Sequence, residues 1–338
     1  MKSRFTPKPL ADQVIVITGA SSGIGLATAY RAASRGARVV LVARNKPALD
    51  AAAEAIRSAG GQALTVVADV AERDQVQAVA QAAIRTFGTF DTWVNNAGIG
   101  MFGTLDEVTE GDHRRIFDVN YFGVVNGSLV AAEHFRRHGG TIVNLGSVAS
   151  DITLPLQGPY SATKAAVRAF TDGLRMELIH EGAPVRLSLI RPLAIDTPFA
   201  EHARNYLERE PRLPPPLFAP EKVADTILQA AEQAGRDYYV GPGAQAATLA
   251  NKLVPGVIDR VAARFAPAAS KRFSAPQRAA AGNLFTPGRD GDVRGDNSTT
   301  RLHGRSADAP RPSRAPLAAT VAVALVGTVL TLLGGRRT

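Results

Sequence analysis

The stretch VIVITGASSGIGLATAYRAASRGARVVLVAR, residues 14–44, contains the pattern that decides the fold. An apolar run leads into a glycine-rich turn, an alanine-rich helical segment follows, and a second apolar run closes the unit. This order is typical of a dinucleotide-binding βαβ unit. Glycines at such a turn let backbone N–H groups and the helix N-terminus approach a pyrophosphate, and three are placed to do so: Gly19, Gly23 and Gly25. The alternative is a tight strand–helix turn without a ligand, and the flanking buried runs favour the dinucleotide interpretation.

The same alternation of short apolar runs and longer helical segments continues to residue 241. Strands are predicted at 14–18, 38–43, 63–69, 91–97, 141–147, 185–191 and 237–241. Helices are predicted near 23–35, 47–59, 73–87, 110–136, 158–180 and 221–234. Continuous Val, Ile and Leu runs suit strands buried on both faces, and regular alternation suits a parallel sheet between helices. We therefore expect an α/β fold, a Rossmann-like doubly wound parallel sheet in a three-layer α/β/α arrangement.

The C-terminal third of the chain changes character twice. One or two amphipathic helices are predicted over 243–265, and we expect the dinucleotide-binding and catalytic domain to span 1–270. A Pro/Gly/Arg-rich linker or poorly ordered arm is expected over 271–316. The nineteen residues 317–335 carry no charge and precede Arg336 and Arg337, which predicts a transmembrane tail anchor, with a buried core or dimer helix as the alternative.

These segments together predict a location. A C-terminally anchored enzyme would lie on the cytoplasmic face of a membrane, and without the anchor it would be cytoplasmic. The first residues, MKSRFTPKPLADQ, lack the apolar region of a cleavable signal peptide.

Composition excludes several classes of site. The chain has no cysteine, which rules out disulfides and thiolate metal sites and fits a reducing compartment. Its six histidines show no metal-ligand spacing, so no catalytic metal is expected. The formal charge of +9 resides mostly in residues 271–338, where eleven Lys and Arg face four Asp. The remainder is nearly neutral, which argues against a nucleic-acid partner.

The residue after the second predicted strand bears on the choice of cofactor. An acidic residue there would hold the adenosine ribose hydroxyls of NAD, but this chain has Ala43 followed by Arg44. An arginine can pair with a 2′-phosphate. The sequence therefore favours NADP(H), with a solvated surface arginine as the alternative interpretation.

The predicted helix around residues 159–170, PYSATKAAVRAF, carries a tyrosine and a lysine four positions apart. This spacing puts Tyr160 and Lys164 on one helical face. A phenol has a pKa of about 10, and we expect the nearby ammonium to lower it, which would ease proton exchange at neutral pH.

The ordered motifs resemble those of the classical short-chain dehydrogenase/reductase (SDR) family. They span about residues 12–241 and comprise TGASSGIG at 18–25, ADV at 68–70, NNAG at 95–98, VN ending at Asn120, NLGS ending at Ser147, YSATK at 160–164 and IDTPF at 195–199. One position departs from the family pattern: Leu193 follows Pro192 where a glycine is usual. The departure puts the size of the substrate in doubt more than the activity.

The resemblance implies a role for each matched residue. The catalytic residues would be Asn120, Ser147, Tyr160 and Lys164. The cofactor-binding residues would be Gly19, Ser21, Ser22, Gly23, Ile24, Gly25, Arg44, Asp69, Val70, Asn96, Ala97, Gly98, Tyr160, Lys164, Pro192, Ile195 and Thr197. Tyr160 would exchange a proton with the substrate oxygen, which Ser147 would also bind. Lys164 would bind the nicotinamide ribose, and Asn120 would support a proton path to that lysine. Family members are usually dimers or tetramers.

The expected function is that of an NADP-dependent oxidoreductase acting on a carbonyl or secondary alcohol. Leu154, Leu156, Leu193, Phe199 and Leu217 predict an apolar pocket wall and hence a hydrophobic small-molecule substrate. Two alternatives remain: an epimerase or dehydratase of the extended branch, and a membrane-anchored, non-catalytic, cofactor-sensing scaffold.

Overall fold

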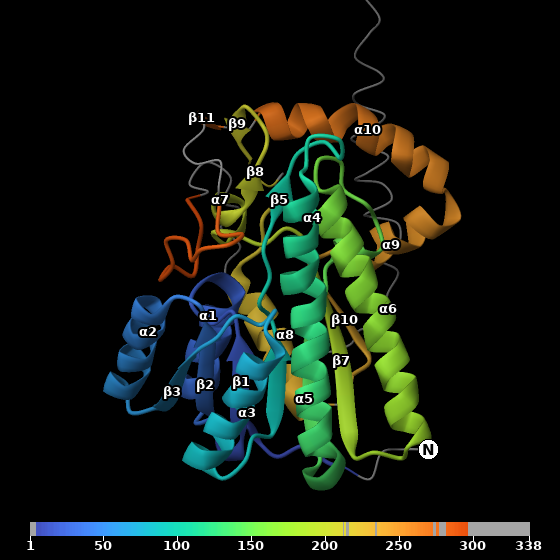
Figure 1. Ribbon diagram of the computed structural model, residues 1–338. Coiled ribbons are helices and arrows are strands. Elements are labelled where there is room, and N and C mark those ends of the chain that lie inside the picture. The colour runs from blue at the N-terminus through green and yellow to red at the C-terminus, as the bar shows by residue number, and fades with distance from the viewer. Residues whose placement is uncertain are drawn as a thin grey trace, which may run out of the picture.

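Seven parallel strands form one sheet at the centre of the protein (Figure 1). They are β1 (Val14–Thr18), β2 (Arg38–Ala43), β3 (Gln62–Val67), β4 (Thr92–Asn95), β6 (Gly140–Leu145), β7 (Val185–Pro192) and β10 (Asp237–Val240). Their order is β10-β7-β6-β4-β1-β2-β3. All seven predicted strands are thus present in one sheet, and the doubly wound α/β fold is confirmed. In this computed structural model the described residues are 5–211, 213, 216–233, 235–272, 275–276 and 282–296.

Helices cover both faces of the sheet, as apolar strands buried on two sides require. One face carries α1 (Gly23–Ser34), α2 (Lys46–Ser58) and α8 (Pro220–Glu232). The other carries α3 (Arg73–Phe87), α4 (Glu110–Phe117), α5 (Gly123–His138) and α6 (Gly158–His180). Figure 1 shows α5 and α6 lying side by side in front of the sheet. Two large apolar clusters result, one on each side.

One predicted helix, 110–136, is interrupted in the structure. A π-helical turn at Asp118–Phe122 separates α4 from α5 and contains Asn120. Such insertions change the direction in which side chains point and are frequent at functional sites.

The strand order reverses between β1 and β4, because β2 and β3 extend to one side of β1 and β4, β6, β7 and β10 extend to the other. Loops at the carboxyl ends of the strands diverge at such a point and leave a crevice in which ligands bind. The sheet topology therefore places the candidate site beyond the ends of β1 and β4.

Smaller elements lie around that crevice. They are the helix α7 (Phe199–His202) and the paired short strands β5 (Met101–Phe102) with β8 (Arg204–Asn205) and β9 (Arg209–Glu210) with β11 (Ala275–Pro276). Two further helices follow the sheet, α9 (Ala244–Leu253) and α10 (Pro255–Arg272). Residues 282–296 then pack against the sheet domain, although they belong to the region interpreted as a linker or poorly ordered arm.

The predicted tail anchor at 317–335 lies outside the described residues and stays a prediction. No helix in the part of the chain that the structure describes has the length and apolar character needed to span a membrane.

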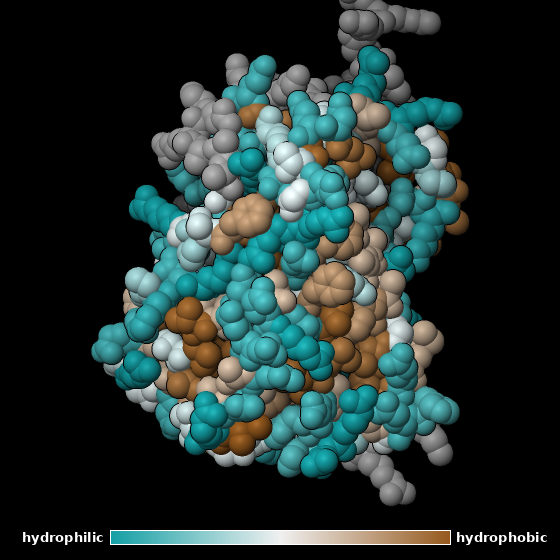
Figure 2. Space-filling model, viewed as in Figure 1, coloured by the Kyte–Doolittle hydropathy of each residue, from teal (hydrophilic) through white to brown (hydrophobic). Residues whose placement is uncertain are grey.

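Apolar side chains gather on the visible face over α5 and α6 (Figure 2). Exposed apolar residues include Phe122, in the π-helical turn before α5, and Met176 and Ile179, on α6. The predicted homodimer or homotetramer remains a prediction.

Candidate active site

A cavity of about 590 Å³ lies at the carboxyl ends of the strands. Nearly all of the predicted site residues line it, although they come from distant parts of the sequence. The lining includes Gly19, Ser21, Ser22, Gly23, Ile24, Arg44, Asp69, Val70, Asn96, Ala97, Gly98, Ser147, Tyr160, Lys164, Pro192, Ile195 and Thr197. Two predicted site residues, Gly25 and Asn120, lie behind this lining.

The glycine-rich turn after β1 forms one end of the cavity. Gly19 and Gly23 have φ angles of 67° and 55°, which favour glycine. A Cβ at Gly25 would lie 2.1 Å from the Gly19 carbonyl oxygen, so no side chain fits there. The N–H groups of Ile24 and Gly25, at the start of α1, donate to no described residue. A glycine cradle with free N–H donors at a helix N-terminus fits the pyrophosphate of a dinucleotide.

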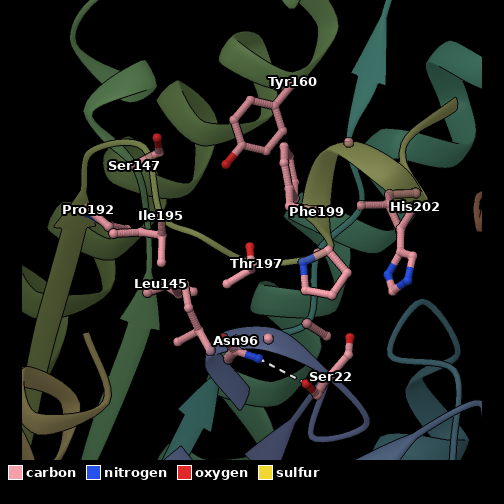
Figure 3. Close-up of a pocket in the computed structure, with 18 of the residues that line it drawn as sticks. Ser22, Asn96, Leu145, Ser147, Tyr160, Pro192, Ile195, Thr197, Phe199 and His202 are labelled. Atoms are coloured by element: carbon pink, nitrogen blue, oxygen red, sulfur yellow. Dashed lines mark hydrogen bonds between the residues drawn. The ribbon is translucent and has the colours of Figure 1, made fainter. Parts of the chain in front are cut away.

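Side chains at the end of β4 hold this turn in place. Asn96 donates through Nδ2 to the carbonyls of Thr18 and Gly19, over 2.9 and 3.1 Å. The Thr18 hydroxyl in turn accepts from the N–H groups of Asn96 and Ala97, over 3.0 and 3.1 Å. Figure 3 shows Asn96 beside Ser22 on the floor of the cavity. The Asn-Asn-Ala-Gly motif therefore supports the turn that would bind the cofactor.

At the other end of the cavity, α6 and the segment after β6 bring three polar side chains together. The side chains of Tyr160 and Ser147 both line this end of the cavity. The Nζ atom of Lys164 lies 5.7 Å from the centroid of the Tyr160 ring and donates to the Leu145 carbonyl over 2.8 Å. The Phe199 ring packs edge-on against Tyr160, with their centroids 5.2 Å apart (Figure 3).

The fourth predicted catalytic residue, Asn120, is fully buried in the π-helical turn. Its Oδ1 accepts from the N–H of Ile99 over 2.8 Å, and its Nδ2 donates to the Ile99 carbonyl and to the Thr163 hydroxyl. Thr163 precedes Lys164 on α6. Asn120 thus ties the loop after β4 to the helix that carries the lysine, and its role in a proton path stays a prediction.

The electrostatics of the Tyr160 site differ from the expectation that Lys164 lowers the pKa of the phenol. Burial raises the pKa of Tyr160 to about 12, although the neighbouring Ser147 side chain acts in the opposite direction. Burial also lowers the pKa of Lys164 to about 8. The reason is that loss of water disfavours the charged form of each group. Tyr160 is therefore a neutral phenol that can donate a proton.

The third region of the cavity surrounds Arg44, at the end of β2. Its guanidinium donates to the carbonyls of Asn283, Leu284 and Phe285, over 2.5, 3.3 and 3.1 Å. Asp69 forms an ion pair with Arg115.

The cavity is also lined by Asn283, Pro287, Gly288 and Asp290, which sequence reasoning did not identify. Their composition, rich in Pro, Gly and Asp, is that of a linker and gave no signal of a binding site.

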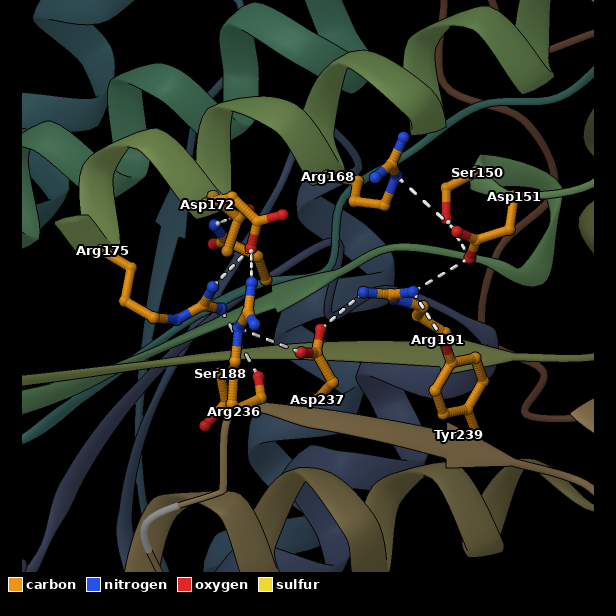
Figure 4. A network of polar contacts seen from close by, with 12 residues as sticks. Ser150, Asp151, Arg168, Asp172, Arg175, Ser188, Arg191, Arg236, Asp237 and Tyr239 are labelled. Atoms are coloured by element: carbon orange, nitrogen blue, oxygen red, sulfur yellow. Dashed lines mark hydrogen bonds and ion pairs between the residues drawn. The ribbon is translucent and has the colours of Figure 1, made fainter. Parts of the chain in front are cut away.

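A buried polar network supports the loop that carries Ser147 (Figure 4). Arg191, at the end of β7, donates to Asp151 over 3.0 Å, to Asp237 over 2.6 Å and to the Tyr239 hydroxyl over 2.7 Å. The side chains of Arg191 and Asp151 are only 8% and 3% exposed. Asp151 ends the short 3-10 turn that begins after Ser147, so the network fixes that turn to the sheet.

Comparison with known proteins agrees with this geometry. The family model described as short chain dehydrogenase matches residues 13–207. The chain belongs to the short-chain dehydrogenase family. It is 44% identical over 264 residues to the uncharacterized oxidoreductase YxnA of Bacillus subtilis (strain 168), covering 77% of this chain and 74% of that protein.

Two solved structures show the same fold. A short-chain dehydrogenase/reductase from Burkholderia phymatum in complex with NAD is 30% identical, with a TM-score of 0.66, and the match covers 76% of this chain and 96% of that one. A short-chain dehydrogenase from Burkholderia cenocepacia J2315 in complex with NADP is 26% identical, with a TM-score of 0.64, and covers 75% and 99%. A nicotinamide cofactor is thus supported for this member of the family. One complex contains NAD and the other NADP, so the two structures do not distinguish between these forms.

The structure also accommodates Leu193, the departure from the family glycine. Leu193 lines the cavity, and its N–H donates to the Val240 carbonyl over 3.0 Å. A Cβ at Gly241 would lie 2.9 Å from the Leu193 side chain, and the φ of Gly241 is +114°. The absence of a side chain at residue 241 therefore leaves room for the leucine.

Proposed function

We propose that the protein transfers a hydride between a nicotinamide cofactor, preferably NADP(H), and the carbonyl or secondary alcohol of a hydrophobic substrate. The observation that carries this proposal is the single cavity with two chemically distinct ends. A glycine cradle with free N–H groups forms one end, and Tyr160 and Ser147 form the other. When bound, the cofactor supplies the hydride in reduction and accepts it in oxidation.

Tyr160 is the general acid of the proposed reduction. With its pKa raised to about 12 by burial, the phenol keeps its proton and donates it to the carbonyl oxygen as that oxygen gains charge. Ser147 donates a hydrogen bond to the same oxygen and holds it in place. Lys164 would hold the nicotinamide ribose, and Asn120 supports the segment around the lysine through Thr163.

The substrate end of the cavity favours an apolar molecule. Around Tyr160 the lining includes Val148, Ile152, Leu154, Leu193, Phe199 and Leu213. Of the predicted wall, Leu154, Leu193 and Phe199 thus line the cavity. Such a surface suits a hydrophobic ketone or secondary alcohol of the steroid, retinoid or fatty acyl type, since apolar lining with few polar groups is typical of sites for such ligands.

The proposed preference for NADP(H) rests on the end of β2. No carboxylate follows Ala43, and Arg44 lines the cavity there. Three of its five N–H donors are directed at carbonyls of residues 283–285, so two remain for a 2′-phosphate.

Titration of the purified full chain with NADPH and NADH, followed by nicotinamide fluorescence, tests the proposal. We expect tighter binding of NADPH, and we expect Arg44→Asp to weaken NADPH about tenfold or more and NADH less, because charged hydrogen bonds contribute about 1.5–3 kcal/mol. Arg73→Asp, at an exposed arginine of α3, is the matched control. Failure of both cofactors to bind would remove the basis for an enzyme. If Arg44→Asp weakened the binding of NADPH and NADH equally, the proposed contact with the 2′-phosphate would be refuted, and the proposed hydride transfer would still stand.

A further inference from the structure

We propose that residues 282–296, here called the wall segment, are part of the cofactor site: they enclose the adenosine half of the bound cofactor and slow its release. This inference rests on the proposed function, since it assumes that the cavity binds a nicotinamide dinucleotide. It assigns a binding role to a region that lies beyond the family match at residues 13–207.

The wall segment is fixed to the residues that would surround the adenosine. Besides the three carbonyl contacts of Arg44, the Asn45 side chain donates to the Gly288 carbonyl over 3.2 Å. Arg115, which pairs with Asp69, also donates to the Leu284 carbonyl over 3.0 Å. The ends of β2 and β3 are thus connected to the wall segment through side chains that reach its main chain.

The wall segment also bonds to the glycine-rich turn itself. The N–H of Gly23 donates to the Asp292 carbonyl, and the N–H of Gly291 donates to the Ser21 carbonyl, both over 2.9 Å. These bonds leave the N–H groups of Ile24 and Gly25 free within the described residues. The contact therefore stabilises the turn without using the donors that fit a pyrophosphate.

Apolar and ionic contacts anchor the two ends of the segment. Near its start, Leu284 is 1% exposed and belongs to the apolar cluster on the α3–α5 face of the sheet. Near its end, Arg294 donates to both carboxylate oxygens of Glu221 on α8, over 2.9 and 2.8 Å. Between them, the His202 ring lies within hydrogen-bond distance of the Arg289 carbonyl, 2.7 Å away.

The wall segment encloses the cavity without filling it. Asn283, Pro287, Gly288 and Asp290 line the cavity, which still measures about 590 Å³ with the segment in place. Ligand pockets are typically about 300–1,000 Å³ in volume. The Oδ1 atom of Asn283 is buried and has no hydrogen-bond donor among the described residues, so a ribose hydroxyl or the adenine amino group would satisfy it. An enclosing wall with an unmatched acceptor is expected to retain a ligand.

The test measures dissociation of NADPH and of NADH from the full chain by stopped-flow displacement. Leu284→Ser loosens the buried anchor, and Arg294→Gln removes the ion pair with Glu221 together with a longer contact of 3.7 Å to the Asp196 carboxylate. We expect Leu284→Ser to raise the dissociation rate of both cofactors about tenfold and Arg294→Gln a few-fold, since changes at a binding surface act mainly on dissociation. Arg289→Gln is the matched control, because it removes one positive charge from an exposed side chain of the same segment.

Hydrogen exchange provides a readout that is independent of turnover. Cofactor binding is expected to slow amide exchange in residues 283–292 of the unaltered chain. If Leu284→Ser and Arg294→Gln leave the dissociation rates and the amide exchange unchanged, the inference about the wall segment is overturned and the proposed function still stands. Tighter cofactor binding by these variants would also overturn the inference, because it would show that the segment obstructs the site. No binding of either cofactor by the unaltered chain would overturn the proposed function together with the inference.

Discussion

The ammonium of Lys164 donates a hydrogen bond to the carbonyl of Leu145, 2.8 Å away, at the last residue of β6. Ser147 follows two residues later, and Tyr160 lies one helical turn before the lysine on α6. The bond therefore fixes the helix that carries the phenol to the strand that ends just before the serine. It also places a charged group in a buried position, where burial lowers its pKa to about 8.

Replacing Tyr160 with Phe is expected to remove turnover and leave cofactor binding nearly unchanged. The hydroxyl is the proposed proton donor, and a general acid contributes about 10²–10⁴-fold to the rate. The phenylalanine ring keeps the edge-on contact with Phe199. Rates with a panel of apolar ketones and NADPH, together with NADPH titration, check this result, and Tyr30→Phe is the control. Retention of substantial activity by the Tyr160 variant would refute its assignment as the acid.

Replacing Lys164 with Met is expected to stabilise the fold at pH 7. The lysine pKa is 10.5 in its ordinary state and about 8 in the fold, so burial of the ammonium costs up to about 3 kcal/mol. Loss of the donor to Leu145 offsets part of the gain, and we expect a net increase of about 1–2 kcal/mol in the free energy of unfolding. Urea denaturation measures it, with the exposed Lys252→Met as control.

The pH dependence of stability checks whether burial of the Lys164 ammonium destabilises the fold. Between pH 8 and 10.5 the unfolded chain binds the lysine proton and the folded chain does not, so the stability of the unaltered protein rises with pH through this window. The Met variant should lack that rise. A variant less stable than the unaltered chain at pH 7 would contradict the prediction.

The same titration should appear in the pH profile of turnover. Above pH 8 the folded protein loses the Lys164 charge, and with it the proposed hold on the nicotinamide ribose. We expect kcat/KM for carbonyl reduction to decline above pH 8, and we expect Lys164→Arg, which keeps its charge, to move that decline to higher pH. A profile that stays flat to pH 10 in the unaltered enzyme would show that the charge is not required.

Local patterns were sufficient to predict most of the architecture. The apolar runs located all seven strands of the sheet, because strands buried on both faces must be apolar throughout. The π-helical turn around Asn120 was not predicted, since one additional residue in a helical turn leaves the apolar periodicity of 110–136 almost unchanged.

The residues of the candidate site likewise include some that the sequence predicted and some that it did not. Gly19 was located from the glycine-rich turn after the first strand, and Asn96 and Ser147 from the resemblance to short-chain dehydrogenase motifs; all three line one cavity because the topology brings those strand ends together. The wall segment was missed because main-chain atoms form most of its contacts to Arg44 and the glycine-rich turn, and main-chain contacts leave no pattern in the sequence.

Replacing Arg191 with Met is expected to destabilise the protein by about 3 kcal/mol. Breaking a buried ion pair leaves an uncompensated charge, here on Asp151, whose side chain is 3% exposed. Arg168, 3.7 Å from the other carboxylate oxygen, compensates only in part. Turnover should fall as well, because Asp151 fixes the turn after Ser147. Thermal or chemical denaturation measures the loss.

Arg236→Gln is the matched control for Arg191. Arg236 also pairs with Asp237, but its side chain is 64% exposed, so its loss should cost less than about 1 kcal/mol. Equal effects of the two substitutions would show that burial of the Arg191 network is not what stabilises it.

Replacing Gly25 with Ala is expected to disrupt the cofactor site. The added Cβ would lie 2.1 Å from the Gly19 carbonyl oxygen and 2.5 Å from the Asn96 amide nitrogen, so the glycine-rich turn must move. We expect at least a tenfold loss of NADPH affinity and destabilisation of about 1–3 kcal/mol, the usual cost of overpacking. Gly173→Ala in α6 is the control, because nothing lies within 4 Å of its Cβ and alanine is the better helix former by about 1 kcal/mol. Unchanged NADPH affinity in the Gly25 variant would show that the turn does not hold the cofactor.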